Sequence, residues 1–192
     1  MSVTRNGRPT DDELVTTLPR EISRESVEQR AFLEHAIEQY GNATYTFAYH
    51  LTGNDADASD LTQEAYIRVF RAWRSFKPGT SFLSWIYRIV TNLYRDELRR
   101  RQRRFYQDEI PERAIAPLEE YVEAHLSEPV SKALAGLTPE QREIVLLADV
   151  DRCSYREIGQ IVGCSVDAVR SRLHRARGHL RKLVNRHMKS SP

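Results

Sequence analysis

The sequence lacks the features that define several large classes of protein. Its 192 residues contain no apolar run near the ~20 residues that a membrane-spanning helix needs. The polar N-terminus, which carries Pro9 and Pro19, gives no sign of a secretory signal. We therefore expect a cytoplasmic protein without membrane insertion. The apolar–polar alternation typical of strands is also missing, so the sequence predicts an all-α fold.

Cysteine is scarce, and the two that are present, Cys153 and Cys164, lie close together in the sequence. A structural zinc site takes four ligands, so two cysteines cannot form one alone. The nearest histidine, His174, belongs to a segment with a different predicted role. We interpret both cysteines as buried or partly buried thiols and predict no metal and no cofactor.

Motifs for catalysis are missing too. The sequence has no glycine loop for phosphate, no H-x-x-x-H metal pair and no nucleophile elbow. The cluster Asp55, Asp57 and Asp60 does not fit a calcium loop, because Asp60 stands where that loop needs glycine and Tyr66 where it needs a carboxylate. We therefore predict that the protein is not an enzyme.

Positive and negative charges are concentrated in different segments, although the net charge is only +2. Residues 95–104 carry six arginines, whereas residues 108–128 carry seven acids against Arg113 alone. With Pro111 and Pro117, the acidic segment is typical of a linker. The sequence predicts two small helical domains, at 26–104 and 128–187, joined by an acidic flexible linker at 105–127 and preceded by a flexible extension at 1–25.

The last third of the chain shows a helix-turn-helix pattern. Ser154 and Glu157 have capping-box spacing, and Gly163 stands where a helix end tolerates positive φ. Ser165 then precedes a second helix. The apolar positions expected in the core are Tyr155, Ile158, Ile161, Val162, Val166, Val169, Leu173, Ala176, Leu180 and Leu183. Upstream, Thr138 to Gln141 predicts another capped helix.

The second helix of this motif is strongly cationic. From Ala168 to Pro192 there are six arginines, two lysines and no acid. A helix with one buried stripe and one cationic face, following a short glycine turn, is typical of binding in the DNA major groove. The exposed candidates are Arg170, Ser171, Arg172, His174 and Arg175. A solvated basic helix in a bundle is the alternative.

The first domain is expected to be divided into helices by Gly41, Gly53-Asn54 and Pro78-Gly79. One of these helices is predicted to open with the acidic motif at Asp60 and to end near Arg74. Its apolar side consists of Leu61, Ala65, Val69 and Trp73. The other side combines acids with one apolar residue, and such a mixture indicates a partner surface. The candidates there are Asp60, Gln63, Glu64 and Ile67.

The next helix is predicted to begin at Thr80 or Ser81 and to reach the basic block. Its core stripe consists of Phe82, Ile86, Ile89, Val90 and Leu93. The opposite face gathers a tryptophan, arginines and an asparagine, which can stack unpaired bases and hold phosphates. The members of this face are Trp85, Arg88, Asn92, Arg95, Asp96 and Arg99. Trp85 could equally pack against a neighbouring helix, while Phe76, Lys77, Ser81 and Phe82 could shape a pocket for a splayed base.

These two blocks resemble the bacterial extracytoplasmic-function (ECF) sigma factors of the sigma-70 family, over about Gln39 to Leu183. The first block, from YGNATYTFAYHLTGNDADASDLTQEAYIRVFRAW through FKPGTSFLSWIYRIVTNLYRDELRR, is similar to the family's domain two. The second, LTPEQREIVLLADVDRCSYREIGQIVGCSVDAVRSRLHRAR, is similar to domain four. The resemblance implies an alternative sigma factor that directs core RNA polymerase to promoters and melts DNA.

The resemblance also implies roles for particular residues. The acidic segment at Asp60, Gln63, Glu64 and Ile67 would bind the β′ clamp helices, and Leu137 to Leu147 the β flap. The loop and helix residues Phe76, Lys77, Ser81, Phe82, Trp85, Arg88, Asn92 and Arg99 would act at the minus-ten element. The helix residues Arg170, Ser171, Arg172, His174 and Arg175 would act at the minus-thirty-five element. The acidic linker would follow the RNA exit path, and an anti-sigma factor is implied as a further partner.

The chain departs from this family at one point that bears on DNA affinity. Asp167-Ala168 stands where relatives often carry Gly-Thr, which removes a hydroxyl that could contact phosphate. The main alternative is an autonomous helix-turn-helix regulator. Such a protein would not need the acidic motif at Asp60 or the face that carries Trp85 and Asn92.

Overall fold

The computed structural model describes residues 24–105 and 126–189, and every regular element in these two ranges is helical. The first range forms α1 (Arg24–Thr52), α2 (Asp55–Ala72), a short 3₁₀ turn (Trp73–Ser75) and α3 (Phe82–Phe105). The second forms α4 (Glu128–Ala135), α5 (Pro139–Val145), a π turn (Leu146–Val150), α6 (Tyr155–Val162) and α7 (Val166–Lys189). The all-α prediction is confirmed. The predicted extension and linker lie almost wholly outside the described residues.

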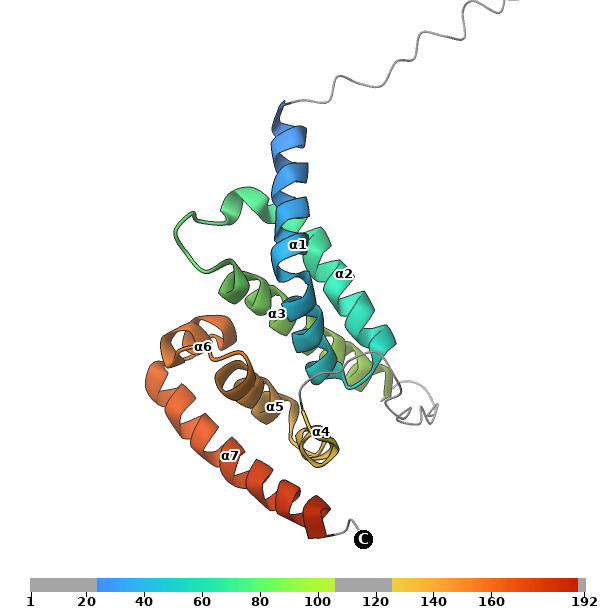
Figure 1. The fold of residues 1–192 in the computed structure, drawn as a ribbon, viewed down its shortest axis with the longest axis vertical. Coiled ribbons are helices and arrows are strands. Elements are labelled where there is room, and N and C mark those ends of the chain that lie inside the picture. The colour runs from blue at the N-terminus through green and yellow to red at the C-terminus, as the bar shows by residue number, and fades with distance from the viewer. Residues whose placement is uncertain (1–23, 106–125, 190–192) are drawn as a thin grey trace, which may run out of the picture.

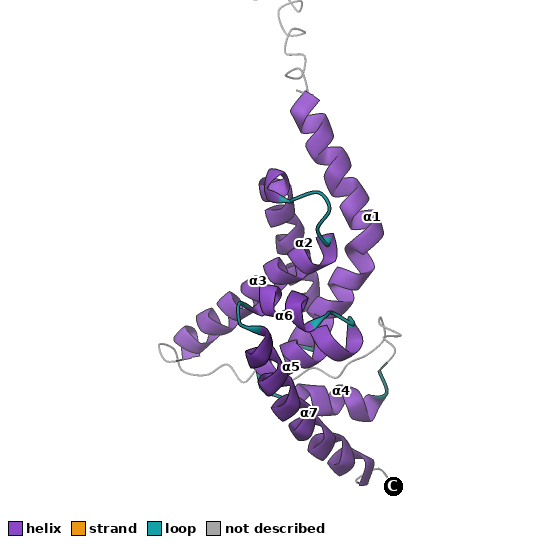
Figure 2. Cartoon of the chain, turned by 90° about the vertical axis from the view of Figure 1, so that its left-hand side faces the viewer, coloured by secondary structure: helices purple, strands orange, loops and turns teal. Residues whose placement is uncertain are grey.

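The helices form two groups, which Figure 1 shows in blue to green and in yellow to red. Helices α1, α2 and α3 pack on one another, while α4, α5 and α6 each pack on α7. Helix α6 also lies against α3, and α5 touches α1, so the two groups are in direct contact (Figures 1 and 2). None of the helices in the described ranges is long and apolar enough to cross a membrane.

The core of the first group comes from the stripes predicted for α2 and α3. Phe82, Ile86, Val90 and Leu93 are all buried, and Ile89 is partly buried. On α1, Phe47 is buried and stacks on Tyr87 of α3, with ring centroids 4.3 Å apart. A stacked aromatic pair adds roughly 0.5–1.5 kcal/mol beyond the burial of its area.

Two predicted boundaries in the first group are wrong. Gly41 does not divide α1, because the helix packs on both α2 and α3, and this packing outweighs the ~1 kcal/mol cost of a glycine in a helix. Helix α2 begins at Asp55 and not at Asp60, because the side chain of Asn54 accepts a hydrogen bond from the Asp57 amide. Its α-helical part ends at Ala72, and a 3₁₀ turn replaces the last predicted turn.

The second group confirms the predicted capping. Thr138 and Ser154 each form a complete capping box, with Gln141 and Glu157 respectively. Along α6 and α7 the predicted apolar stripe is buried or partly buried, except at its first α7 position. Val166 is 40% exposed, because it lies in the first turn of α7, beside the short loop that joins the two helices.

Candidate functional site

The acidic face of α2, formed by Asp60, Gln63, Glu64 and Ile67, lies on the solvent side of the helix. Asp60 and Gln63 are exposed, and Glu64 is half-buried. Ile67 is 38% exposed although it is apolar. The opposite stripe of the helix is buried, at Leu61, Ala65 and Val69. The structure thus places all four predicted residues on one accessible surface.

This surface has a second apolar member that the sequence reading missed. Phe70 is 39% exposed and follows Ile67 by three residues, so the two lie on the same side of α2. A search of the predicted helix for apolar residues three positions apart would have identified Phe70. Glu64 accepts a hydrogen bond from Arg68 at 3.2 Å, but an exposed i,i+4 pair of this kind contributes little to stability.

A hollow of about 300 Å³ separates the acidic face from the basic end of α3. Asp60 and Glu64 line it together with Arg100 and Arg101. Arg101 also donates to Asp57 at 2.9 Å, which ties α3 to the start of α2. The arginine block therefore compensates part of the negative charge of α2.

The loop before α3 contains a tight turn. Thr80 donates to the carbonyl oxygen of Lys77 at 3.1 Å, and Gly79 has a φ of 85°. Proline followed by a positive-φ glycine is typical of a type II turn, in which Pro78 and Gly79 take the two central positions. The turn leaves the Lys77 side chain exposed.

The aromatic residues of this loop pack on one another. The Trp85 ring lies 5.5 Å from Phe76 and 5.6 Å from Phe82, and Phe32 of α1 joins the cluster. Phe82 is only 7% exposed, so it is a core residue in this conformation and not an open stacking surface. Trp85 is half-buried, so it packs on its neighbours and keeps part of its surface accessible.

The polar face of α3, formed by Trp85, Arg88, Asn92 and Arg99, continues from this cluster. Arg88, Asn92 and Arg99 are exposed, as is Ser81 in the preceding loop. Arg99 pairs with Asp96 at 2.7 Å on the surface. Aromatic, amide and cationic side chains are therefore aligned along one helix, an arrangement that can contact unpaired bases and phosphates.

The two helices of the helix-turn-helix are joined as the sequence predicts. Gly163 ends α6 with a φ of 76°, and Ser165 accepts a hydrogen bond from the Ala168 amide at 3.2 Å. A further glycine, Gly159, was not predicted to matter. A Cβ atom at Gly159 would lie 2.7 Å from the carbonyl oxygen of Cys164, so the turn passes directly over α6 at this residue.

We predict that Gly159→Ala destabilises the helix-turn-helix. The added methyl would force the backbone of the turn to move, at a cost of about 1–3 kcal/mol in the free energy of unfolding. Gly178→Ala is the matched control, since a Cβ there meets open space within α7 and should be neutral or stabilise by up to ~1 kcal/mol. Thermal unfolding followed by circular dichroism measures both variants. Equal melting temperatures for the two would contradict the prediction.

The cationic face of α7 is accessible along its whole length. Its predicted members Arg170, Ser171, Arg172, His174 and Arg175 are all exposed. Arg170 pairs with Asp167 at 2.8 Å on the surface. Asp167 therefore reduces the net positive charge of this face and also occupies one of its arginines in this structure.

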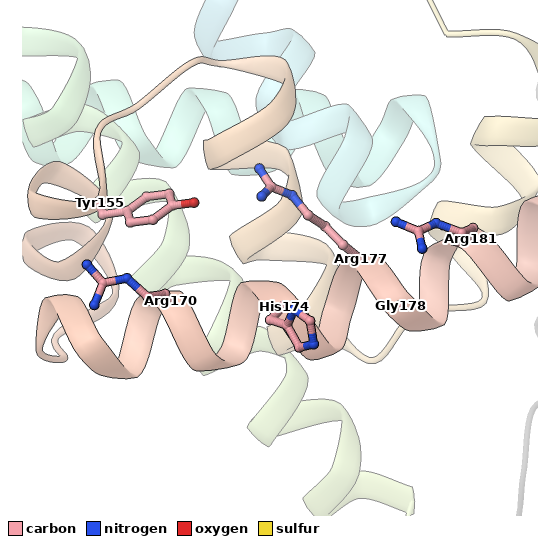
Figure 3. A pocket seen from close by; sticks show the side chains of 6 residues that line it. All are labelled: Tyr155, Arg170, His174, Arg177, Gly178 and Arg181. Carbon is pink, nitrogen blue, oxygen red and sulfur yellow. The ribbon is translucent and has the colours of Figure 1, made fainter.

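Beside this face, α7 and Tyr155 of α6 enclose a shallow hollow of about 460 Å³ (Figure 3). Arg170, His174, Arg177 and Arg181 line it. Arg177 also forms an ion pair with Asp149 of the π turn, and this bond raises the pKa of its guanidinium. The hollow extends the cationic surface beyond the residues that the sequence predicts.

The two thiols are half-buried and do not form a disulfide. Burial raises the pKa of Cys153 to about 12, so its reactive thiolate form is disfavoured near neutral pH. Within residues 24–105 and 126–189, no group of three or more histidine, cysteine or acidic side chains is arranged to hold a metal ion.

A set of polar bonds joins the two helical groups, and we call it the interdomain contact. Arg95 of α3 forms two hydrogen bonds with Glu143 of α5, at 3.0 and 3.1 Å. Four further bonds cross the same boundary. They are Tyr87 to Asp151 at 2.6 Å, Ser84 to Glu157 at 3.2 Å, Arg95 to the carbonyl oxygen of Val162 at 3.3 Å, and Arg142 to the carbonyl oxygen of Leu51 at 2.7 Å. Arg95 therefore does not belong to the free part of the polar face on which the sequence placed it.

Two acids of this contact are strongly desolvated. Glu143 is 2% exposed, and burial raises its pKa to about 7 although Arg95 opposes the shift. Burial likewise raises the pKa of Asp151 to about 6, against the hydrogen bond from Tyr87. In this structure burial therefore favours the neutral form of both carboxyl groups.

Two family models match this chain, one over each of the two helical groups. Residues 36–104 match the family model of Sigma-70 region 2, and residues 127–180 match that of Sigma-70, region 4. The ECF RNA polymerase sigma factor SigW of Bacillus subtilis is 31% identical over 168 residues, which cover 81% of this chain and 89% of that protein. The chain belongs to the ECF RNA polymerase sigma factors. The match to region 2 decides against an autonomous regulator.

Other ECF sigma factors are similar over most of this chain. SigE of Mycolicibacterium smegmatis is 40% identical over 160 residues, and the match covers 80% of this chain but 62% of that protein. Among solved structures, the sigma factor RpoE in complex with the anti-sigma factor NepR, from Bartonella quintana, has a TM-score of 0.65 at 25% identity, covering 79% of this chain and 96% of that one. CnrH, in complex with the cytosolic domain of CnrY, has a TM-score of 0.60 at 27% identity, covering 82% and 89%.

Proposed function

We propose that this ECF sigma factor directs core RNA polymerase to specific promoters and initiates transcription by promoter recognition and DNA melting. The observation that carries the proposal is the presence of three chemically distinct accessible surfaces on one chain. They are the acidic face of α2, the polar face of α3 and the cationic face of α7. An acidic–apolar surface fits a protein partner, whereas the other two fit DNA.

The two domains are assigned different binding partners. In this proposal domain two, residues 26–104, binds the β′ clamp helices and the minus-ten element. Domain four, residues 128–187, binds the β flap and the minus-thirty-five element. Most apolar side chains between Leu137 and Leu147 are buried, so flap binding would use the rim of α5 or a rearranged domain. The residues from 105 to 127 would connect the domains along the RNA exit path.

The proposal extends to control and location. We expect an anti-sigma factor to hold this protein inactive. In support, the similar RpoE structure contains the anti-sigma factor NepR, and the CnrH structure contains the cytosolic domain of CnrY. The protein would act in the cytoplasm with the polymerase, without catalysis of its own and without a cofactor. Sigma factors in general are not enzymes, and this supports the expectation that the protein has no catalytic activity.

Run-off transcription with purified core polymerase tests the proposal. Core enzyme alone should give no specific transcript, whereas addition of this chain should give transcripts that start downstream of promoters bound by it. If the chain bound promoter DNA alone with full specificity and added nothing to core enzyme, the proposed function would be wrong.

The cationic face of α7 should separate into base-contacting and phosphate-contacting residues. Alanine at Arg170 or Arg175 should remove discrimination at one upstream base pair, since a bidentate arginine–guanine contact contributes roughly 1–3 kcal/mol. Arg172→Ala should weaken binding to all sequences alike and reduce its salt dependence.

Binding of each variant to duplexes with scanned upstream bases, at two salt concentrations, measures both effects. Lys182→Ala, on the exposed C-terminal half of α7, controls for the loss of one positive charge. Equal losses on every sequence for both Arg170 and Arg175 would make this helix a phosphate anchor. Sequence specificity would then have to come from domain two.

A further inference from the structure

We propose that the middle of α7 holds a binding site for a phosphate group, formed by His174, Arg177, Gly178 and Arg181. We call it the Gly178 site. Three of its four members, all except His174, lie outside the residues assigned above to the minus-thirty-five element. The inference rests on the proposed function where the phosphate belongs to promoter DNA, and it is independent of that function where the phosphate belongs to a free ligand.

Gly178 is the only glycine of α7, and the described part of the chain does not require a glycine there. Its φ lies outside the positive region that favours glycine. A Cβ atom at Gly178 would meet no heavy atom within 4 Å, whereas one at Gly159 would meet the backbone of the turn. Glycine inside a helix is less stable than alanine. The use of glycine that remains is to let another molecule approach the backbone closely.

Positively charged and hydrogen-bonding side chains flank this gap on the surface of the helix. His174 precedes Gly178 by four residues and Arg181 follows it by three, so both lie beside it on one face of α7. Figure 3 shows Gly178 between these two residues, and all three line the hollow of about 460 Å³ together with Arg177. Each of the four is exposed. The gap is therefore surrounded by groups that attract an anion.

The charge of the site is only partly compensated within the chain. Asp149 accepts a hydrogen bond from Nε of Arg177 at 3.1 Å and so occupies that guanidinium. Among the described residues, neither Arg181 nor His174 has a hydrogen-bond or ion-pair partner, and α7 contains no acid after Asp167. A guanidinium presents its donors in a planar fork that matches the oxygens of a phosphate. Arg181 can therefore bind a phosphate that enters beside Gly178.

The backbone at Gly178 contributes space to the site and not hydrogen bonds. Inside an α-helix each N–H already donates to the carbonyl oxygen four residues earlier. The phosphate would therefore be held by side chains, with the guanidinium of Arg181 and the ring of His174 as donors. A methyl group on residue 178 would project into the gap between them. Gly178→Ala should consequently favour the helix and oppose binding.

The position of the site along α7 favours a phosphate of the DNA backbone. Ser171, Arg175 and Gly178 follow one another at spacings of four and three residues, so they lie on one side of the helix. Gly178 also follows Arg170 by eight residues, which is about 12 Å of helix. The N-terminal residues of a recognition helix contact base edges, and the major groove is about 12 Å wide. A helix that reads bases at Arg170 therefore brings Gly178 to a strand that borders the groove.

Two variants of the full chain test the site through DNA binding. Gly178→Ala and Arg181→Ala should each weaken binding to duplexes with the upstream element by about 10-fold at about 0.1 M salt, since one phosphate contact contributes about 0.9 to the slope of log K against log salt. The loss should be equal for every sequence, and Arg181→Ala should reduce the slope by about one. Lys182→Ala removes a neighbouring exposed charge that does not line the hollow, and it should lose less affinity.

Thermal unfolding separates an effect on binding from an effect on folding. Gly178→Ala should leave the melting temperature unchanged or raise it, because alanine favours a helix. Gly41→Ala makes the same change within α1, where the Cβ atom would lie 3.7 Å from the Ile37 side chain, and it should bind DNA as the unchanged chain does. A loss of DNA affinity in a variant that is at least as stable is a result that a structural role for Gly178 does not produce.

Nuclear magnetic resonance of the full chain distinguishes the two sources of phosphate. The amide signal of Gly178 should shift when the upstream duplex is added. A shift with the duplex and none with inorganic pyrophosphate assigns the site to DNA. If pyrophosphate shifts the same signal and displaces the duplex, and Arg181→Ala abolishes both effects, the site also accepts the phosphate of a free ligand. If poly-glutamate alone shifts the signal, the site belongs to an acidic protein partner and the proposal is overturned.

The site and the proposed function fail in different measurements. Unchanged affinity of both Gly178→Ala and Arg181→Ala for duplex and for pyrophosphate would overturn the Gly178 site, and run-off transcription by the unchanged chain with core polymerase would still support the proposed function. Absence of that transcript would overturn the proposed function instead. The shift of the Gly178 signal by pyrophosphate, and its loss in Arg181→Ala, would then still decide on the site.

Discussion

Reversal of the two acids on α2, by Asp60→Lys and Glu64→Lys together, should reduce the affinity for core RNA polymerase by about 100-fold or more. The change places like charges where the proposed surface meets a complementary partner, and such juxtapositions cost several kcal/mol in protein interfaces. The fold should survive, because Asp60 is exposed and the Glu64–Arg68 bond is a surface pair that contributes little.

Titration of labelled core enzyme measures the dissociation constant directly. Glu34→Lys with Glu38→Lys is the matched control, since it makes the same change in net charge at exposed positions of α1. Circular dichroism confirms the helix content of each variant. Undiminished core binding by a folded double variant of Asp60 and Glu64 would remove this face from the proposed interface. If the α1 control lost the same affinity for core enzyme, the change in net charge would explain the loss and not the position of the two acids.

The same face of α2 carries two apolar side chains beside its acids, so its contacts with a partner can be both apolar and charged. Ile67 and Phe70 remain over a third exposed, and exposed apolar groups ringed by polar ones mark protein interaction sites. In interfaces, a few buried apolar anchors supply most of the affinity while surrounding charges set orientation and the rate of association. The acids and the apolar pair of α2 fit these two roles.

Local signals in the sequence were sufficient for much of this fold. Both capping boxes, the positive φ of Gly163 and the buried stripes of α2, α3 and α7 depend on neighbours within one or two helical turns. Interactions of that range are visible in residue spacing alone. The exposure of Ile67 also followed from spacing, because its position on α2 lies away from Leu61, Ala65 and Val69.

The features that sequence reasoning predicted wrongly or missed all depend on tertiary contacts. Gly41 was expected to end a helix, but packing on two neighbours keeps α1 continuous. The need for Gly159 arises from a backbone passing over it, which no spacing rule reveals. Arg95 was assigned to a face of free cations, yet its partner Glu143 is 48 residues away in the chain and belongs to the other domain. Distant partners of this kind cannot be deduced from a single sequence.

Among substitutions at the DNA-binding surfaces, we expect the largest loss of promoter opening at Asn92, on the polar face of α3. Asn92→Ala should reduce open-complex formation on duplex promoters by about 10–100-fold, because loss of a hydrogen bond that leaves a base group unsatisfied costs roughly 1–3 kcal/mol. Asn92 is exposed and makes no part of the aromatic cluster, so its replacement should leave the fold unchanged. Trp85 is a less simple target, because its ring also packs on Phe76 and Phe82.

Comparison of duplex and pre-melted promoters separates strand opening from the other contributions. Unpairing costs a few kcal/mol per flipped base, and a pre-melted template has already met this cost. Permanganate reactivity of unpaired thymines should therefore show a large defect for Asn92→Ala on duplex DNA and a small one on the pre-melted template. Gln102→Ala, at an exposed position near the end of α3, should behave as the unchanged chain on both. Equal defects of Asn92→Ala on the two templates would assign this residue to base capture after melting, and the opening step would then fall to the aromatic cluster around Trp85.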